Sequence, residues 1–246
     1  MDAWQSVALG AGGLASGFLN TLAGGGSVIS LPLLEWVTGS AAVANATNRI
    51  AILFQNVAAV AGFHTGRAVP FRLALRLVPV ALLGALLGAW LAVSIHTKSL
   101  RLALSLAVVF VAVSAVVRPP RTPPLRGFST HVAFLLVGFY IGFLQVGVGF
   151  LLLACLAGGL GLDLVRANAA KVFLVLLVTG PTLVIFGMKG QLRLYEGCIL
   201  SLGNMLGAWL ASRLAIERGS AWVRVVVFAA ALVAIVKLLL FPSGPG

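Results

Sequence analysis

Two basic residues stand at equivalent places in an otherwise apolar chain. Arg49 directly follows Asn48, Lys171 lies three residues after Asn168, and each basic residue begins a long apolar run. An anion site requires a fixed positive charge together with neutral donors that replace the hydration shell of the ion. Basic residues at helix ends also commonly extend their charged heads toward the membrane surface. The recurrence of the pattern favours an anion site that contains Arg49, Lys171, Asn48 and Asn168.

Glycine-rich segments interrupt two of the apolar runs and offer backbone N–H groups that could also bind an anion. Glycine has a low helix propensity, so we expect a helix to end at each segment, with a serine capping the next helix in the first run. The free N–H groups at the start of a helix, together with its dipole, attract an anion. Small residues also allow close helix packing, which leaves a second reading open. The candidate residues are Gly24, Gly25, Gly26 and Ser27 in the first run, and Gly147 and Gly149 in the second.

Asn20 and Gln145 place an amide near the middle of the same two runs. Each amide follows a Gly-Phe-Leu sequence, at 17–19 and 142–144. A buried amide without a partner is costly, so we expect both side chains to donate hydrogen bonds to the anion. Catalytic clusters, nucleotide-binding loops and metal-ligand spacings are absent from the sequence. We therefore expect no catalytic residue, no metal and no cofactor, and a protein that is not an enzyme.

The composition is that of an integral membrane protein. Hydrophobic residues make up 61% of the 246 residues, charged residues make up 9%, and the mean hydropathy is +1.11. Soluble domains average about 45–50% apolar and about 25% charged residues. Lys and Arg exceed Asp and Glu by 17 to 5, but the basic residues are scattered between apolar runs, so we expect contact with membrane lipid and no binding of nucleic acid.

Stretches without a charged residue divide the chain into eight apolar segments. They are 3–34, 50–66, 77–97, 102–117, 127–162, 172–188, 197–212 and 225–236. Segments 3–34 and 127–162 exceed the length of about 20 residues that a membrane span needs. Both contain the glycines described above, so we expect each to break or to re-enter the membrane there.

The second half of the chain repeats the landmarks of the first half in the same order. The sequence GALLGAWLA at 84–92 recurs as GNMLGAWLA at 203–211, and its Gly-x-x-x-Gly spacing is typical of closely packed helices. We predict an all-α polytopic membrane fold with two four-segment repeats, 1–117 and 127–246. A proline-rich linker at 118–126 joins them into one membrane domain.

The relative orientation of the two repeats depends on the two long segments. If all eight segments cross the membrane the copies are parallel, whereas re-entrant long segments make the copies inverted. The distribution of Lys and Arg mildly favours inversion.

An internal repeat in a polytopic membrane protein is typical of a secondary transporter, whose site lies at the repeat interface near the midplane. Duplication for structural reasons alone leaves two alternatives open, an anion channel and, with less support, a membrane-embedded enzyme. The expected partners are a small anionic substrate and membrane lipid, and a homodimer is compatible with the sequence.

Four motifs resemble those of a known family. They are Leu22-Ala23-Gly24-Gly25-Gly26 with Pro32 downstream, Ala46-Thr47-Asn48-Arg49, Gly138-Phe139-Tyr140-Ile141-Gly142, and Gln145-Val146-Gly147-Val148-Gly149. The sequence is similar along nearly its whole length to the TauE/SafE family of sulfite and organosulfonate exporters. The resemblance implies a multi-pass permease of the bacterial inner membrane for small sulfur-containing anions such as sulfite, thiosulfate or organosulfonates.

Overall fold

A computed structural model describes residues 1–116 and 124–240, and among these residues every regular element is a helix. The elements are α1 (Ala3–Leu22), α2 (Ser27–Thr38), α3 (Ala41–Thr65), α4 (Phe71–Ser94), α5 (Thr97–Val116), α6 (Phe128–Phe143), α7 (Val148–Leu153), the π-helical segment η1 (Ala154–Gly159), α8 (Leu164–Met188) and α9 (Leu194–Leu240). The predicted all-α class is confirmed. Most of the predicted linker 118–126 lies outside the described residues.

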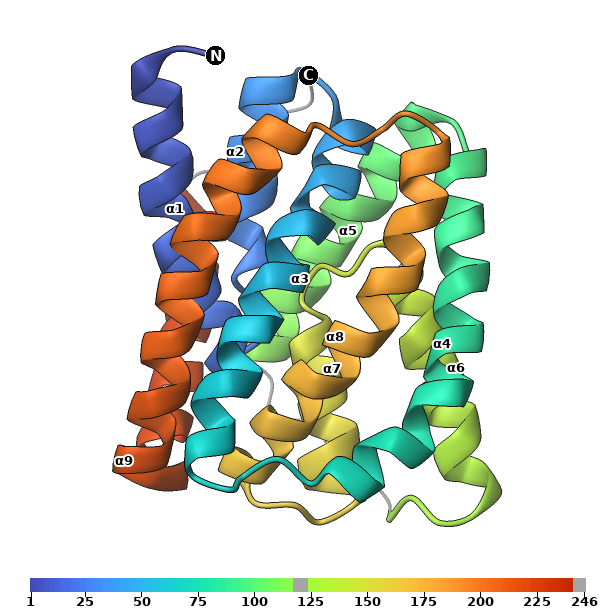
Figure 1. The fold of residues 1–246 in the computed structure, drawn as a ribbon, viewed down its shortest axis with the longest axis vertical. Coiled ribbons are helices and arrows are strands. Elements are labelled where there is room, and N and C mark those ends of the chain that lie inside the picture. The colour runs from blue at the N-terminus through green and yellow to red at the C-terminus, as the bar shows by residue number, and fades with distance from the viewer. Residues whose placement is uncertain (117–123, 241–246) are drawn as a thin grey trace.

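The first long apolar segment is a helical hairpin. Helix α1 ends at Leu22, and α2 begins at Ser27 after a turn in which Gly24 has a φ of 84°. Helix α2 folds back along α1. The two helices lie so close together that a Cβ at Gly12 would overlap the side chain of Leu33. The N-terminus and the end of α2 therefore lie at the same end of the molecule (Figure 1).

The second long segment forms a matching hairpin from the opposite end. Helix α6 ends at Phe143 and α7 begins at Val148, with Gln145 and Gly147 in left-handed backbone conformations between them. The N–H of Leu125 donates to the carbonyl of Gly159 at 2.9 Å, so η1 returns to the end where α6 began. The predicted breaks at both glycine segments are confirmed, and the two hairpins enter from opposite ends (Figure 1).

Helices α3, α4, α8 and α9 extend along most of the long axis of the molecule (Figure 1). Within the part of the chain that the structure describes, three helices are long and apolar enough to cross a membrane. They are Phe71–Ser94, Leu164–Met188 and Leu194–Val223. The last is the first part of α9, whose backbone leaves the helical conformation at Gly219. Helix α3 has 25 residues, but the polar side chains buried along it lower its hydropathy. The eight segments and their repeat stay predictions.

The Gly-x-x-x-Gly motifs bring each hairpin against a helix of the other half. A Cβ at Gly88 in α4 would clash with the carbonyl of Phe139 in α6, and one at Gly207 in α9 would clash with the carbonyl of Leu14 in α1. Reciprocally, a Cβ at Gly142 would clash with the carbonyl of Ala85. Small residues allow such close approach of two backbones, so the predicted packing role of these motifs is confirmed.

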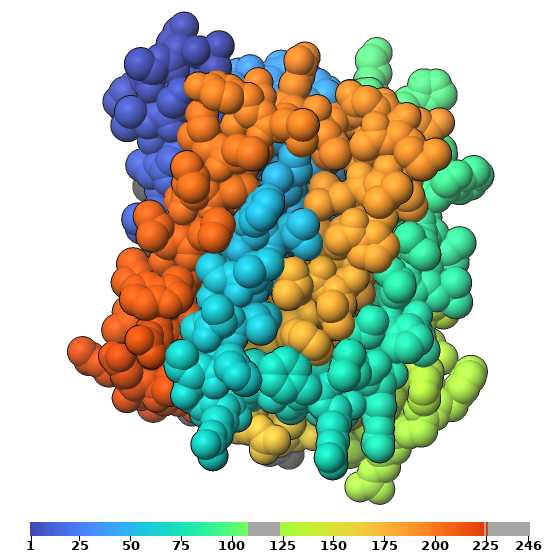
Figure 2. Space-filling view, in the orientation of Figure 1, coloured from blue at the N-terminus to red at the C-terminus, as the bar shows by residue number. Residues whose placement is uncertain are grey.

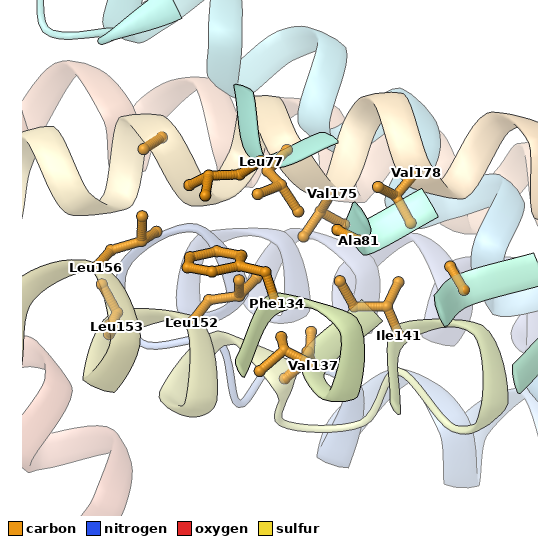
Figure 3. Close-up of a cluster of buried hydrophobic side chains, with 14 of the residues drawn as sticks. Leu77, Ala81, Phe134, Val137, Ile141, Leu152, Leu153, Leu156, Val175 and Val178 are labelled. Carbon is orange, nitrogen blue, oxygen red and sulfur yellow. The ribbon is translucent and has the colours of Figure 1, made fainter. Parts of the chain in front are cut away.

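An apolar cluster holds the second hairpin against α4 and α8 (Figure 3). Phe134 and Ile141 of α6 and Leu152 of α7 are fully buried in it, and Val178 of α8 covers them. On the outside, large side chains such as Trp90 are exposed. Figure 2 shows α3 and α8 side by side on one face, between α9 and α4. These two helices carry the basic residues singled out by the sequence.

Candidate functional site

The two hairpin turns meet inside the molecule, the second one through Gly149 at the start of α7. A Cβ at Gly24 would overlap the backbone of Gly149, and a Cβ at Gly149 would overlap the Cα of Gly24. Only glycine at both positions allows the turns to touch in this way. The contact explains why glycines occur midway along both long segments, and it places turn residues of both halves in one site.

A small cavity of about 20 Å³ lies beside this contact. It has room for about one water molecule. Its walls come from α1, α3, α7, α8 and both turns. The lining residues are Asn20, Gly24, Ile52, Gln55, Asn56, Gln145, Val148, Gly149, Lys171 and Val175. Lys171 is the one ionisable side chain among these lining residues, so the wall carries positive charge and amide groups but no carboxylate.

Lys171 of α8 closes the C-terminal end of α1. Its Nζ donates to the carbonyls of Asn20 at 3.0 Å and Thr21 at 2.8 Å, and to Oδ1 of Asn168 at 2.6 Å. The last carbonyls of a helix have no partner within the helix and carry the negative end of its dipole, so a cation is favourable there. All three N–H groups of the ammonium thus have an acceptor in the protein.

Arg49 of α3 has the equivalent position at the end of α6. Its Nη1 donates to the carbonyl of Ile141 at 2.8 Å and to Oε1 of Gln145 at 3.2 Å. Its Nη2 donates to the carbonyls of Gly142 at 2.6 Å and Phe143 at 3.3 Å. The side chain is completely buried, so it does not extend to the membrane surface, and neither does the 3% exposed Lys171.

An aromatic ring completes the surroundings of the Arg49 guanidinium. Its Cζ lies 4.3 Å from the centre of the Phe186 ring, a distance suited to a cation–π interaction. Its Nε is buried and has no hydrogen-bond partner. The two basic residues that recur in the sequence are therefore both bound to the carbonyl end of a hairpin helix, each from the other half of the chain.

Amide side chains connect the two turns to the crossing helices. Oδ1 of Asn20 accepts from the N–H of Gly26 at 3.2 Å, and its Nδ2 donates to Oε1 of Gln55 at 3.3 Å. Nδ2 of Asn204 in α9 donates to the same Gln55 oxygen at 3.2 Å. Gln145 Nε2 donates to Oγ1 of Thr179 at 2.9 Å. These contacts hold the cavity amides in defined orientations.

The structure brings five of the twelve predicted binding residues to the cavity wall. They are Asn20, Gly24, Gln145, Gly149 and Lys171. The others lie in the turns or behind the wall, namely Gly25, Gly26, Ser27, Gly147, Asn48, Arg49 and Asn168. Ser27 is not the predicted helix cap, because Gly26 is the capping residue of α2 and Ser27 Oγ is buried without a partner. Binding of an anion by any of these residues stays a prediction.

Sequence reasoning missed the contribution of α3 to the cavity. Gln55 and Asn56 line the wall and are each 2% exposed. They are two adjacent amides inside the segment 50–66, where polar groups are expensive in a membrane and mark functional positions. That signal was present in the sequence. Thr179 and Asn204, which orient the amides from behind, could be found only from the fold.

Comparison with known proteins identifies the family. A sequence model described as "Sulfite exporter TauE/SafE" matches residues 9–238. The chain belongs to the TauE/SafE family. The motif resemblance stated from the sequence is confirmed, and a TauE/SafE protein with these apolar helices is a membrane protein.

Three curated proteins are similar to this TauE/SafE chain along most of its length. "Probable membrane transporter protein YfcA" of Escherichia coli K12 is 25% identical, over 92% of this chain and 86% of its own. "Probable membrane transporter protein ORF9" of Sinorhizobium sp is 24% identical, over 94% and 90%. A "Probable membrane transporter protein" of Haemophilus influenzae is 26% identical, over 87% of each. No solved structure matches the chain significantly.

Proposed function

We propose that this chain is a secondary transporter that moves small sulfur-containing anions, such as sulfite, thiosulfate or organosulfonates, across the bacterial inner membrane. The observation that carries the proposal is the central cavity, whose wall holds Lys171 and several amides but no carboxylate. A buried positive charge surrounded by neutral donors suits an oxyanion. The family description and the names of the similar proteins support transport as the activity.

The arrangement of the helices supports an inverted repeat and alternating access. The hairpin α1–α2 enters from one end and the hairpin α6–η1 from the other. Helix α1 packs on α9 and α6 packs on α4, so each hairpin lies against a helix of the opposite half. In transporters built from inverted repeats, motion of one half against the other exposes a midplane site to each side in turn.

The proposed binding residues are those that reach the cavity, with the charge of Lys171 at their centre. Asn20, Gln145 and Gln55 supply neutral donors, and Gly24 and Gly149 allow backbone to approach. A cavity of about 20 Å³ suits one water molecule, whereas a sulfur atom with three oxygens needs more room. We therefore propose that this is a closed form of the transporter, which loads its substrate when the two turns separate. Membrane lipid is proposed to cover the exposed apolar side chains, and the homodimer stays a prediction.

Ligand-induced stabilisation of the purified protein tests the proposal. A ligand that binds only the folded state raises the unfolding temperature with its concentration. We expect sulfite, thiosulfate, sulfoacetate or taurine to do so in the parent protein and in Lys189→Gln, which changes an exposed lysine at the end of the same helix α8. Lys171→Gln is expected to abolish the shift. An equal shift in Lys171→Gln would contradict the proposed site.

Transport itself is measured after reconstitution into liposomes. A carrier is expected to show uptake of the stabilising anion that saturates with concentration. Single-channel currents without saturation would instead establish the anion channel. Conversion of the anion to another product by the purified protein would establish the membrane-embedded enzyme. Absence of both stabilisation and uptake for all four compounds would refute transport of sulfur anions.

A further inference from the structure

Gln145 occupies a backbone conformation that normally selects glycine. Its φ is 62°, in the left-handed region, where a residue with a Cβ is strained. In the first half the left-handed residue of the turn is Gly24, whereas Asn20, which matches Gln145 in the repeat, lies within α1. Strained residues concentrate at functional sites because the surrounding structure must hold them there. A glutamine held in this conformation on the wall of the cavity therefore points to a role for its side chain.

Arg49 determines which end of the Gln145 amide faces which neighbour. The oxygen and nitrogen of an amide are distinguished by their hydrogen-bond partners. A guanidinium has donors only, so the atom of Gln145 that meets Nη1 of Arg49 must be the oxygen Oε1. The nitrogen Nε2 then faces Oγ1 of Thr179 with one of its two hydrogens. The second hydrogen remains for the cavity, which Gln145 lines.

On the other side of the cavity, the hydrogen-bond partners of Asn20 and Gln55 also determine which end of each amide is the oxygen. The backbone N–H of Gly26 requires an acceptor, which identifies the facing atom of Asn20 as Oδ1. The nitrogen of Asn20 and that of Asn204 then both donate to Oε1 of Gln55. Two donors use both lone pairs of that oxygen, so the other end of the Gln55 amide is a donor as well.

Arg49 has no donor left with which to bind an anion directly through its terminal nitrogens. Its two Nη groups carry four hydrogens, and these meet four acceptors at the carbonyls of Ile141, Gly142 and Phe143 and at Gln145. Phe186 covers the guanidinium, and Arg49 is not among the residues that line the cavity. Arg49 therefore does not touch a ligand in the cavity. Lys171, whose N–H groups are also all taken, does line the cavity and acts there through its charge.

We infer that Arg49 is a positioning residue, which fixes the Gln145 amide so that its N–H faces the cavity and donates to the bound oxyanion. The inference rests on the proposed function and assigns separate roles to the residues of that same site. Lys171 supplies the charge, and Gln145 and Gln55 supply N–H donors. Asn56 uses its Nδ2 on the carbonyl of Ile52 at 2.8 Å and leaves its oxygen as an acceptor in the same wall. A ligand rich in acceptor oxygens and poor in donors fits such a wall.

A double-mutant cycle distinguishes positioning from direct contact. The dissociation constant of sodium thiosulfate and of sodium sulfite is measured by calorimetry for the parent protein, Arg49→Lys, Gln145→Met and the double variant. Non-additivity reports that two residues act through one another. We expect each single change to weaken binding about ten-fold, which is about 1.4 kcal/mol, and the double variant to bind as weakly as Gln145→Met alone. Multiplying losses would show that Arg49 acts independently of Gln145 and would overturn the inference.

Gln145→Glu keeps the test valid if Arg49→Lys lowers the folded yield. A carboxylate at position 145 retains an acceptor for Arg49 but has no N–H to offer the ligand. We expect an unfolding temperature at least equal to that of the parent and thiosulfate binding weakened ten-fold or more. Unchanged binding would overturn the inference. The control Arg213→Lys alters an exposed arginine whose Nη1 contacts Thr65, and its binding should equal that of the parent.

The outcome for the parent protein separates this inference from the proposed function. If the parent binds neither thiosulfate nor sulfite, the proposed function fails and the assignment fails with it. If the parent binds and the losses multiply, only the role of Arg49 is overturned.

Discussion

Replacing Gly17 with alanine isolates the effect of close backbone packing in this membrane fold. Gly17 lies in α1, and a Cβ there would overlap the backbone of Asn204 in α9. Gly10 lies about two turns earlier in the same helix, and a Cβ there would meet no atom within 4 Å. Gly17→Ala and Gly10→Ala are therefore matched in helix and in substitution. They differ in what the added methyl group contacts.

The expected difference follows from two contributions of known size. Alanine is better than glycine inside a helix by about 0.5–1 kcal/mol, and this gain applies to both variants. At Gly17 an overpacking cost of about 1–3 kcal/mol is added, and the backbone of Asn204 cannot rotate away as a side chain could. We expect the free energy of unfolding of Gly17→Ala to lie about 1–3 kcal/mol below that of Gly10→Ala.

Thermal unfolding in detergent, followed by tryptophan fluorescence, measures the difference. For a chain of this size, 1 kcal/mol corresponds to about 2–4 °C, so the unfolding temperatures should differ by roughly 2–12 °C. Elution at the monomer or oligomer volume of the parent protein is checked for both variants. An unfolding temperature of Gly17→Ala equal to or above that of Gly10→Ala would refute the close packing of α1 on α9.

Three further expectations concern packing, the central contact and surface charge. Gly88→Leu should lower the yield of folded protein, because a bulky side chain forces α4 away from α6. The order of preference among the four sulfur anions should change little. A normal yield with an altered order of preference would contradict this. Gly24→Ala should unfold at a lower temperature than Gly39→Ala, because both glycines have a positive φ but only a Cβ at Gly24 would meet another backbone. Equal unfolding temperatures would argue against the contact between the turns. The exposed ion pair of Arg101 and Glu35, at 2.9 Å, should contribute at most about 1 kcal/mol to the free energy of unfolding. Glu35→Gln should therefore shift the unfolding temperature by a few degrees at low salt and by less in 1 M NaCl. A larger shift that persists in salt would refute this.

The helical breaks could be predicted because they depend on local properties of the chain. Segments 3–34 and 127–162 are too long for single spans, and each contains glycines of low helix propensity near its middle. The structure breaks both where the glycines occur. The packing role of Gly88 could be predicted for the same reason, since its spacing from Gly84 puts both on one helix face. The number of helices that meet the length and hydropathy of a span could not be predicted, because it depends on the helix bounds. Helix α3 begins at Ala41 and so includes polar residues that the charge-free segment 50–66 leaves out.

The site was predicted in part, because residue types are visible in a sequence and partners are not. Asn20, Gln145 and Lys171 were selected by their recurrence in the two halves and do line the cavity. Arg49 was selected by the same reasoning, but its guanidinium is turned to the end of α6. A carbonyl at a helix end is a backbone group that every residue carries, so no side-chain pattern shows that it will take the donors of an arginine.

The sequence by itself determined that the chain is an all-helical membrane protein, that two segments break at glycines, and that two positive charges recur among apolar residues. These properties follow from hydropathy, helix propensity and spacing, which act over one or two helical turns. The tertiary structure decided that the two turns meet through Gly24 and Gly149, and that Lys171 lines the cavity whereas Arg49 orients Gln145 from behind it. These contacts join residues about 100 or more positions apart, and only the packing of one half against the other brings them within hydrogen-bonding distance.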